Sequence, residues 1–500
     1  MNKFVLLLLI ISVSACGTLN PGPQEPEFTR ASPDNFLWQE LRTLQPGDWA
    51  APLNAGPEAL DWRLRAIDSA TDSIDLQTFL WSFDTVGSLV LDHLVAAADR
   101  GVLVKLLIDD TFLAGEESAL LALAEHSNIE YRIFNPFLRR SDNLITREIL
   151  NLAEFHRLDH RMHNKSMIVD GRIAIVGGRN LADEYFGLDE AANFRDMELI
   201  VGGPIVAEIA NAFDAYWNDR WSLPIENVAR IEPSIADMEA ARKAQDNTSQ
   251  LHMEESSEAR KARWVEMVGN AFAGQIVLDV DEPPQENPAD ADSAPIQVRD
   301  ELIDLFDSAL EEILIISAYL IPTPVLEGAI ERAAARGVRV RILTNSIGSN
   351  NHLAAHSAYR NHVEQLMRKG AQLHEVRVDA MERGLYILPP IDSKSLALHA
   401  KVLIVDQDRV FIGSANLDAR SLRLNTEMGL LVTSEALNKE LRQQVALDFS
   451  PAISWRLEFD DSGEVIWVSD EVVLTSQPAL SPLQRIEDWF FSHLPLEGEL

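Results

Sequence analysis

Short apolar runs recur along the chain, separated by glycine and by charged segments. The runs at residues 74–80, 104–108, 313–319 and 340–343 are rich in Ile, Leu and Val, which is typical of buried β-strands. Between the members of each pair lies a helical pattern that ends at Gly101 or Gly337, and glycine commonly closes the last turn of a helix. The pattern predicts strand–helix–strand units of an α/β protein.

A hairpin follows each of these units. Residues 164–168 and 401–405 form further apolar runs, and residues 173–176 and 410–412 are predicted to be their return strands. Asp170-Gly171 and Asp406-Gln407 are typical of the tight turns between such strands. Because strand, helix, strand and hairpin occur twice, we expect two related α/β units rather than a solenoid.

The same three chemically active residues follow each other in both units. A common offset of 236 residues relates His163 to His399, Lys165 to Lys401, Asp170 to Asp406 and Asn180 to Asn416. A single match of this kind can arise by accident, but two in register with the same tail do not. The duplication therefore predicts one active site built from both halves, with a pseudo-twofold relation between them.

Two histidines fit the cleavage of a phosphodiester. One imidazole can attack phosphorus while the other donates a proton to the leaving alcohol. The lysines can neutralise the non-bridging oxygens, and Asn180 and Asn416 can donate hydrogen bonds to them. Asp196 and Glu427, which become equivalent when the following methionines are aligned, are candidates to orient the imidazoles.

The aspartates of the two motifs have two possible roles. Asp170 and Asp406 are grouped with the catalytic residues, although a purely structural role in their turns is equally open.

A metal site is not expected, because a lysine stands where a second ligand should be. We predict that the enzyme uses neither a metal nor another cofactor.

At these residues the chain resembles the phospholipase D superfamily, and within it the bacterial cardiolipin synthase branch. The similarity covers residues 74–77, 161–166, 176–180, 343–346, 425–429 and 466–468. It implies two α/β/α sandwich units with the active site at their interface. It also implies His163 as the nucleophile that forms a phosphohistidine, His399 as the general acid, and Glu427 as an orienting carboxylate. Ser414 is implied to contact the phosphate, a contact that Gly178 cannot make in the first half.

The predicted organisation has six parts. They are a lipoprotein-type signal peptide (1–16), an N-terminal lead (17–57), the first catalytic domain (58–230), a helical segment with an acidic, proline-rich linker (231–300), the second catalytic domain (301–450) and a C-terminal extension (451–500). In the extension, Trp489 and Phe490 are predicted to pack onto the second domain, with a membrane-interface patch as the alternative.

The N-terminus and the charge bear on location. The apolar run 4–13 is too short to span a bilayer and precedes Cys16, the sole cysteine, in a Val-Ser-Ala-Cys context that resembles a bacterial lipoprotein signal. We expect lipidation at Cys16 and anchoring to the cell envelope, facing the periplasm; an ordinary signal peptide is the alternative. The net charge of −35 argues against nucleic acid as a partner.

The favoured function is transfer of a phosphatidyl group from a phospholipid to phosphatidylglycerol, the reaction of a cardiolipin synthase. Hydrolysis of phospholipid to phosphatidic acid is the first alternative, because it needs the same residues with water as acceptor. A nuclease on the same fold is less favoured by the acidic composition and by the lipidation signal. A binding lipoprotein without catalytic activity is disfavoured by the two intact motifs.

Overall fold

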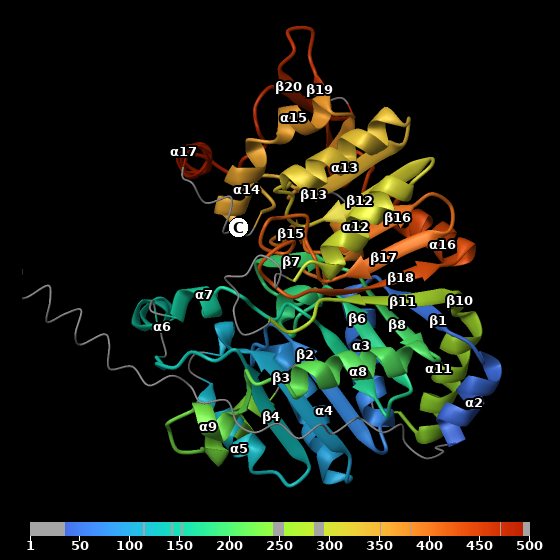
Figure 1. Ribbon diagram of the computed structural model, residues 1–500, viewed down its shortest axis with the longest axis vertical. Helices are drawn as coiled ribbons and strands as arrows, with labels where there is room; N and C mark the ends of the chain where they lie inside the picture. The colour runs from blue at the N-terminus through green and yellow to red at the C-terminus, as the bar shows by residue number, and fades with distance from the viewer. Residues whose placement is uncertain are drawn as a thin grey trace, which may run out of the picture.

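The computed structural model of the chain describes residues 36–113, 116–141, 144–151, 154–243, 255–284, 295–350, 352–380, 382–470 and 472–493. The predicted signal and Cys16 lie outside these residues, as do residues 285–294 of the acidic linker. Figure 1 shows two α/β halves, one above the other, with the N-terminal half below. The prediction of two related α/β units is confirmed.

The first half is built on a nine-stranded mixed sheet. Its strand order is β10-β1-β8-β6-β5-β2-β3-β4-β9, and β2, β3 and β4 are parallel. The strands are β1 (Trp49–Leu53), β2 (Ser73–Thr78), β3 (Leu103–Asp109), β4 (Ile129–Phe134), β5 (Ser166–Val169), β6 (Ile173–Gly177), β8 (Glu198–Gly202), β9 (Ser222–Pro224) and β10 (Phe272–Ala273).

The second half repeats this arrangement in a ten-stranded sheet, ordered β11-β18-β17-β16-β12-β13-β14-β19-β20-β21. The strands are β11 (Gln275–Val280), β12 (Glu312–Ser317), β13 (Arg339–Asn345), β14 (Ala371–Val376), β16 (Lys401–Val405), β17 (Arg409–Gly413), β18 (Met428–Thr433), β19 (Ser454–Phe459), β20 (Val465–Ser469) and β21 (Val472–Leu474). Both predicted hairpins are present, as β5–β6 and β16–β17. The predicted N-terminal lead and C-terminal extension are not separate from the sheets, because they supply β1 and β19–β21.

Helices cover the sheets and connect the parallel strands (Figure 1). In the first half they are α2 (Phe36–Leu44), α3 (Gly56–Ser69), α4 (Thr85–Asp99), α5 (Glu117–Ala124), α6 (Leu144–Leu150), α7 (Phe155–Leu158), α8 (Ile205–Trp217), α9 (Ile225–Val228), α10 (Ile235–Arg242) and α11 (Ser257–Asn270). In the second half they are α12 (Gln297–Ser308), α13 (Pro324–Ala335), α14 (Leu353–Arg360), α15 (Val363–Arg368), α16 (Glu435–Val445) and α17 (Pro482–Phe491). Helices α4 and α13 stop as predicted at Gly101 and Gly337, whose φ angles of 99° and 88° suit glycine.

The two halves are joined by backbone pairing and by a shared core. Strand β7 (Ala192–Arg195) of the first half pairs in parallel with β15 (Ser395–Leu398) of the second. A second bridge pairs Met162 with Thr426, and one cluster of buried apolar side chains continues through both halves. Only Gly274 separates β10 in the first sheet from β11 in the second. The junction is therefore a packed interior, which can hold catalytic groups from both halves in fixed positions.

The C-terminal helix α17 packs onto α14 of the second half. The prediction that Trp489 and Phe490 pack there is wrong, because both side chains remain more than half exposed while polar residues of the helix make the contact. Among the residues that the structure describes, no helix combines the length and apolar character needed to cross a bilayer.

Candidate active site

Each motif histidine is held by a carboxylate from the opposite half. The Nδ1 atom of His163 lies 2.9 Å from Oε2 of Glu427, and Nδ1 of His399 lies 2.7 Å from Oδ2 of Asp196. The sequence identified all four residues but did not show that the pairs cross between the halves. The catalytic groups can therefore assemble only when both halves are folded against each other.

Backbone pairing across the junction fixes the two histidines. The amide of His163 donates to the carbonyl of Thr426 at 2.9 Å, directly before Glu427. The amide of His399 donates to the carbonyl of Arg195 at 2.9 Å, directly before Asp196. In both cases the hydrogen bond joins the backbone of the histidine to the residue directly before its carboxylate partner. Neither side chain can therefore move far relative to the other.

A second pair of equivalent residues orients the segment before each histidine. At the end of β3, the Asp109 carboxylate accepts from the amide of Met162 at 3.1 Å. At the end of β13, the side chain of Asn345 accepts from the amide of Leu398 and donates to its carbonyl, both at 2.8 Å. Asp109 and Asn345 are also 236 residues apart, so the same offset that located the motifs could have located these supports.

The histidines line one cavity of about 690 Å³ between the halves. Asn180 and Asn416 also line it, and in both the side-chain oxygen is buried without a protein hydrogen-bond partner. Ten of the 24 lining residues are aromatic or aliphatic: Phe79, Leu80, Phe112, Phe137, Leu158, Tyr185, Phe194, Tyr319, Ile321 and Ala355. The cavity combines this apolar surface with polar and charged groups, an arrangement that suits an amphipathic ligand.

Aromatic rings fix the faces of both imidazoles. The Phe79 ring meets His163 edge-on with centroids 5.0 Å apart, and the Tyr185 ring meets His399 in the same way at 4.9 Å. The Tyr185 hydroxyl also accepts from the Asn180 amide at 2.8 Å. The rings cover a side of each imidazole and the carboxylates occupy the Nδ1 atoms, which leaves the Nε2 atoms as the groups available to a ligand.

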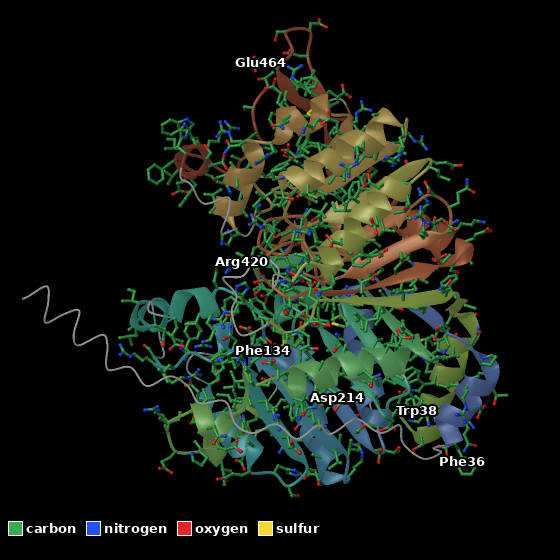
Figure 2. The ribbon with its side chains drawn as sticks, in the orientation of Figure 1. Phe36, Trp38, Phe134, Asp214, Arg420 and Glu464 are labelled. Carbon is green, nitrogen blue, oxygen red and sulfur yellow. The ribbon has the colours of Figure 1, made fainter. Side chains whose placement is uncertain are left out.

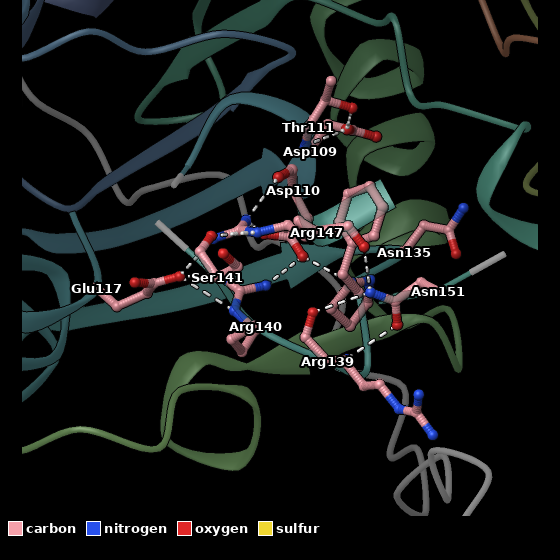
Figure 3. A network of polar contacts seen from close by, with 12 residues as sticks. Asp109, Asp110, Thr111, Glu117, Asn135, Arg139, Arg140, Ser141, Arg147 and Asn151 are labelled. Atoms are coloured by element: carbon pink, nitrogen blue, oxygen red, sulfur yellow. Dashed lines mark hydrogen bonds and ion pairs between the residues drawn. The ribbon is translucent and has the colours of Figure 1, made fainter. Parts of the chain in front are cut away.

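A buried ion-pair network supports the first-half wall of the cavity (Figure 3). Asp110 and Glu117 bind Arg140 and Arg147, and Arg147 is fully buried. The Asn151 side chain ties the Arg139 backbone to α6, accepting from its amide and donating to its carbonyl, both at 2.9 Å. The network thus fixes the segments that bring Thr111, Phe137 and Asn151 to the cavity.

The protonation states of the site residues favour a nucleophilic imidazole. Burial, reinforced by the neighbouring lysines, lowers the pKa of His163 to about 4 and that of His399 to about 3. Burial opposes ionisation of Glu427 and Asp196, but the facing histidines and lysines outweigh it and lower the pKa of both carboxyls. At neutral pH each ionised carboxylate therefore accepts the Nδ1 proton of a neutral imidazole, and Nε2 keeps its lone pair.

The two lysines lie behind the histidines rather than on the cavity wall. Lys165 Nζ donates to the carbonyl of His163 at 2.6 Å, and Lys401 makes the same bond to His399. Burial lowers the pKa of Lys165 to about 7 and that of Lys401 to about 8. Each titrates near neutral pH, and an anionic phosphate in the cavity would favour the charged form of both.

The structure changes the roles expected for Ser414 and Gly178. Ser414 is fully buried, and its hydroxyl donates to the Glu427 carboxylate and accepts from the amide of Met428. It supports the carboxylate instead of contacting a phosphate, and it does not line the cavity. At Gly178 an added Cβ would come within 3.0 Å of the Asp196 carboxyl carbon, so glycine leaves room for the carboxylate that binds His399.

The predicted catalytic role of Asp170 and Asp406 is corrected by their contacts. Both adopt left-handed φ angles, 51° and 49°, in the turns of their hairpins. The Asp170 carboxylate accepts from the amides of Thr71, Asp72 and Ser73, and Asp406 accepts from the amides of residues 310–312. These bonds hold the start of β2 and of β12, so both aspartates are structural residues whose carboxylates do not face the cavity.

Two arginines at the cavity were not assigned from the sequence. Arg420 of the second half lies between the halves (Figure 2) and binds Asp159 of the first half at 2.8 Å. Arg161 binds the backbone carbonyl of Asn135 at 3.0 Å and stacks over Phe137. Arg161 lies in a segment that carries the family resemblance, whereas no sequence signal marks Arg420. Both line the cavity and both are paired with a carboxylate, Arg161 with Asp109 at 3.5 Å and Arg420 with Asp159 at 2.8 Å.

Two neutral imidazoles facing one cavity, each held by a carboxylate from the other half and carried on equivalent strands, define an enzyme of the phospholipase D type. The family model described as "Cardiolipin synthase, PLD-like domain" matches residues 64–217 and 302–448. The chain therefore belongs to the phospholipase D superfamily and is cardiolipin synthase-like.

Similarity to known proteins agrees with membership of this superfamily. Cardiolipin synthase C of Escherichia coli is 33% identical over 460 residues, which cover 89% of this chain and 95% of that protein. An uncharacterized protein of Helicobacter pylori is 29% identical and covers 98% of both chains. The crystal structure of phosphatidylserine synthase from Haemophilus influenzae matches the fold with a TM-score of 0.53 at 16% identity, covering 82% of this chain and 90% of that one.

Proposed function

We propose that the protein is a phosphatidyltransferase that moves a phosphatidyl group from a phospholipid to phosphatidylglycerol. The observation that carries the proposal is the crossed pair of histidine–carboxylate contacts at a single cavity. The similarity to cardiolipin synthase C supports the choice of a lipid donor and a lipid acceptor. The aromatic and aliphatic residues of the cavity support it independently, because the acyl chains of a lipid need an apolar surface.

The first half-reaction forms a phosphohistidine. Nε2 of His163 attacks phosphorus, the bond from phosphorus to the headgroup oxygen breaks, and the headgroup alcohol leaves with a proton from His399. Glu427 stabilises the positive charge that develops on His163, as the carboxylate does in a catalytic triad. Because burial keeps His399 neutral in the free enzyme, its proton must be taken up when the anionic phosphate enters and raises its pKa.

The second half-reaction reverses the roles. Neutral His399 removes the proton from a hydroxyl of phosphatidylglycerol, the resulting oxygen attacks phosphorus, and the bond to His163 breaks. The amides of Asn180 and Asn416 are proposed to donate to the non-bridging oxygens, and the charges of Lys165 and Lys401, which lie behind the histidines, to stabilise them at longer range. The products are cardiolipin and a regenerated His163.

Hydrolysis is the second candidate, since water can replace the acceptor in the second half-reaction. Purified protein incubated with phosphatidylglycerol in water enriched in ¹⁸O separates the two by mass spectrometry. Cardiolipin without ¹⁸O supports transfer, whereas ¹⁸O-labelled phosphatidic acid supports hydrolysis. Cleavage of DNA without turnover of lipid would instead support a nuclease. The same assay with EDTA tests the prediction that no metal is used, and a loss of activity restored by added metal would contradict it.

We also propose that the protein is a lipoprotein of the bacterial cell envelope, anchored through Cys16 and facing the periplasm. The support is the short apolar run followed by Val-Ser-Ala-Cys. In a bacterial host, Cys16→Ser should abolish incorporation of labelled palmitate into the protein. Incorporation that persists in this variant would contradict lipidation at Cys16.

A further inference from the structure

Helix α17 is packed with its amphipathic faces reversed. The side chains of Gln484 and Asp488 point to the protein: Gln484 donates to the carbonyl of Ile347 at 2.8 Å, and fully buried Asp488 binds His356 at 2.7 Å. The opposite face carries Leu483, Ile486, Trp489 and Phe490, which are 61%, 62%, 55% and 56% exposed. A surface helix of a globular protein normally buries its apolar face, but no part of the chain that the structure describes covers this stripe.

Helix α17 is attached to a helix that borders the catalytic cavity. Helix α17 is fixed to α14 by Asp488, which also accepts from Ser357 at 2.9 Å and binds Arg360 at 3.0 Å. At its other end, α14 reaches the cavity, because His352 and Ala355 form part of the wall. The exposed apolar residues of α17 are therefore carried by the same structural unit that borders the site.

Helix α6 of the first half also exposes apolar side chains next to a residue that lines the cavity. Helix α6 is anchored through fully buried Arg147, which binds Glu117 at 2.9 Å, and it leaves Ile149 and Leu150 61% and 40% exposed. The next residue, Asn151, lines the cavity. Figure 1 shows α6 and α17 on the same side of the molecule, below and above the junction of the halves.

We propose that the exposed residues of α17 and α6 form a membrane-docking surface that seats the mouth of the cavity on a lipid bilayer. The inference rests on the proposed function, because a lipid substrate must leave a bilayer to reach the histidines. Tryptophan and phenylalanine beside aliphatic residues suit the interface between headgroups and acyl chains. The net charge of −35 gives no general attraction to an anionic membrane, so insertion of apolar side chains would supply the affinity.

Vesicle binding tests the proposal directly. The full chain carrying Cys16→Ser, which removes any acyl anchor at that position, is sedimented with vesicles of phosphatidylethanolamine and phosphatidylglycerol. Ile486→Ser/Trp489→Ser/Phe490→Ser should lower the vesicle partition coefficient by at least about tenfold, because three inserting side chains are lost. The control is Leu103→Ser/Leu310→Ser, whose native side chains are 57% and 80% exposed. Leu103 begins β3 and Leu310 precedes β12, at the ends of these strands away from the cavity. The control should bind as the unsubstituted chain does.

A second pair of measurements keeps the docking inference separate from the proposed function. The α17 variant should lose turnover of vesicle lipid but keep turnover of dispersed short-chain phosphatidylglycerol. If the α17 variant binds vesicles as well as the control does, the docking surface is overturned. This is also the result expected if the stripe binds another protein instead of a membrane. Absence of lipid turnover by every form, the unsubstituted chain included, overturns the proposed function, while the sedimentation result still decides the docking surface.

Discussion

Nδ1 of His163 lies 2.9 Å from a carboxylate oxygen of Glu427, a residue 264 positions later in the other half of the chain. The reciprocal contact joins His399 to Asp196. A duplicated enzyme could hold each histidine with a carboxylate from its own repeat, but this one does not. Each imidazole is oriented only when the two sheets share their interface, so catalysis is coupled to correct assembly of the halves.

Glu427→Gln should lower kcat by about 10²–10⁴-fold, because the amide can still hold His163 but cannot stabilise its positive charge. Asp196→Asn should act in the same direction through His399. The measurement is the steady-state rate with phosphatidylglycerol, together with the thermal midpoint of each variant. Glu208→Gln, at an exposed position on α8, is the matched control. A rate near that of the control for Glu427→Gln would show that the carboxylate does not assist the reaction.

The covalent intermediate should form on His163. Rapid alkaline quenching of the enzyme during turnover preserves phosphohistidine, and peptide mass spectrometry then locates the phosphatidyl group. We expect the adduct on His163 in the unsubstituted enzyme and none in His163→Ala, which should be inactive. An adduct on His399 would reverse the assignment of nucleophile and general acid without changing the paired mechanism.

The pH dependence of kcat/KM should be bell-shaped, since this quantity reports ionisations of the free enzyme. His163 has a pKa of about 4, so the rate should fall as the pH drops through that value and the nucleophile becomes protonated. Lys165 and Lys401 have pKa values of about 7 and 8, and they carry the charge that attracts phosphate only below them. Because His399 must also take up a proton when the substrate binds, the rate should already decline as the pH rises above about 4, and more steeply above about 7 as the lysines lose their charge.

A substitution can show which lysine controls the alkaline limb of the pH profile. Lys165→Met removes the group with the lower lysine pKa, so the remaining alkaline limb should move to higher pH while the maximum rate falls. An alkaline limb that keeps its position in Lys165→Met would mean that another group controls it.

Asp170→Asn should affect stability and not chemistry. The carboxylate accepts from the amides that begin β2 and from the Trp38 indole at 2.8 Å, and asparagine tolerates the left-handed φ of 51°. Loss of these charge-assisted bonds in a fully buried position should lower the free energy of unfolding by about 2–4 kcal/mol. Thermal unfolding and kcat of the same preparation check this. A kcat reduced by about a hundredfold in the folded variant would restore a catalytic role.

Local patterns were enough to predict the elements that carry the site. Apolar runs, aspartate-containing turns and glycine at helix ends depend on short-range chemistry, and the strands, hairpins and helix ends follow them. The offset of 236 residues aligns the two motif histidines and the two asparagines, and the methionines at 197 and 428 align the two orienting carboxylates. The same offset relates Asp109 to Asn345, a pair that could have been found in the same way.

What the sequence did not reveal depends on long-range geometry. Periodicity shows that α17 has an apolar stripe, but it cannot show that Asp488 finds buried partners on α14 and turns the stripe outward. Likewise, a serine after a strand suggests a phosphate contact, and only the fold shows that Ser414 supports Glu427. The aspartates of the hairpins were misassigned because the amides that they bind lie about a hundred residues away in the chain.

Gly178 should tolerate no side chain, because the two halves support their carboxylates differently. The second half has Ser414, which hydrogen-bonds the Glu427 carboxylate, whereas Asp196 has a shorter side chain and occupies the space beside Gly178. A Cβ in Gly178→Ala would push Asp196 away from His399, so kcat should fall by at least about tenfold as acid–base assistance weakens. Gly269→Ala is the control, since its Cβ would meet open space in α11. Activity of Gly178→Ala equal to that of Gly269→Ala would show that the position of Asp196 does not limit the reaction.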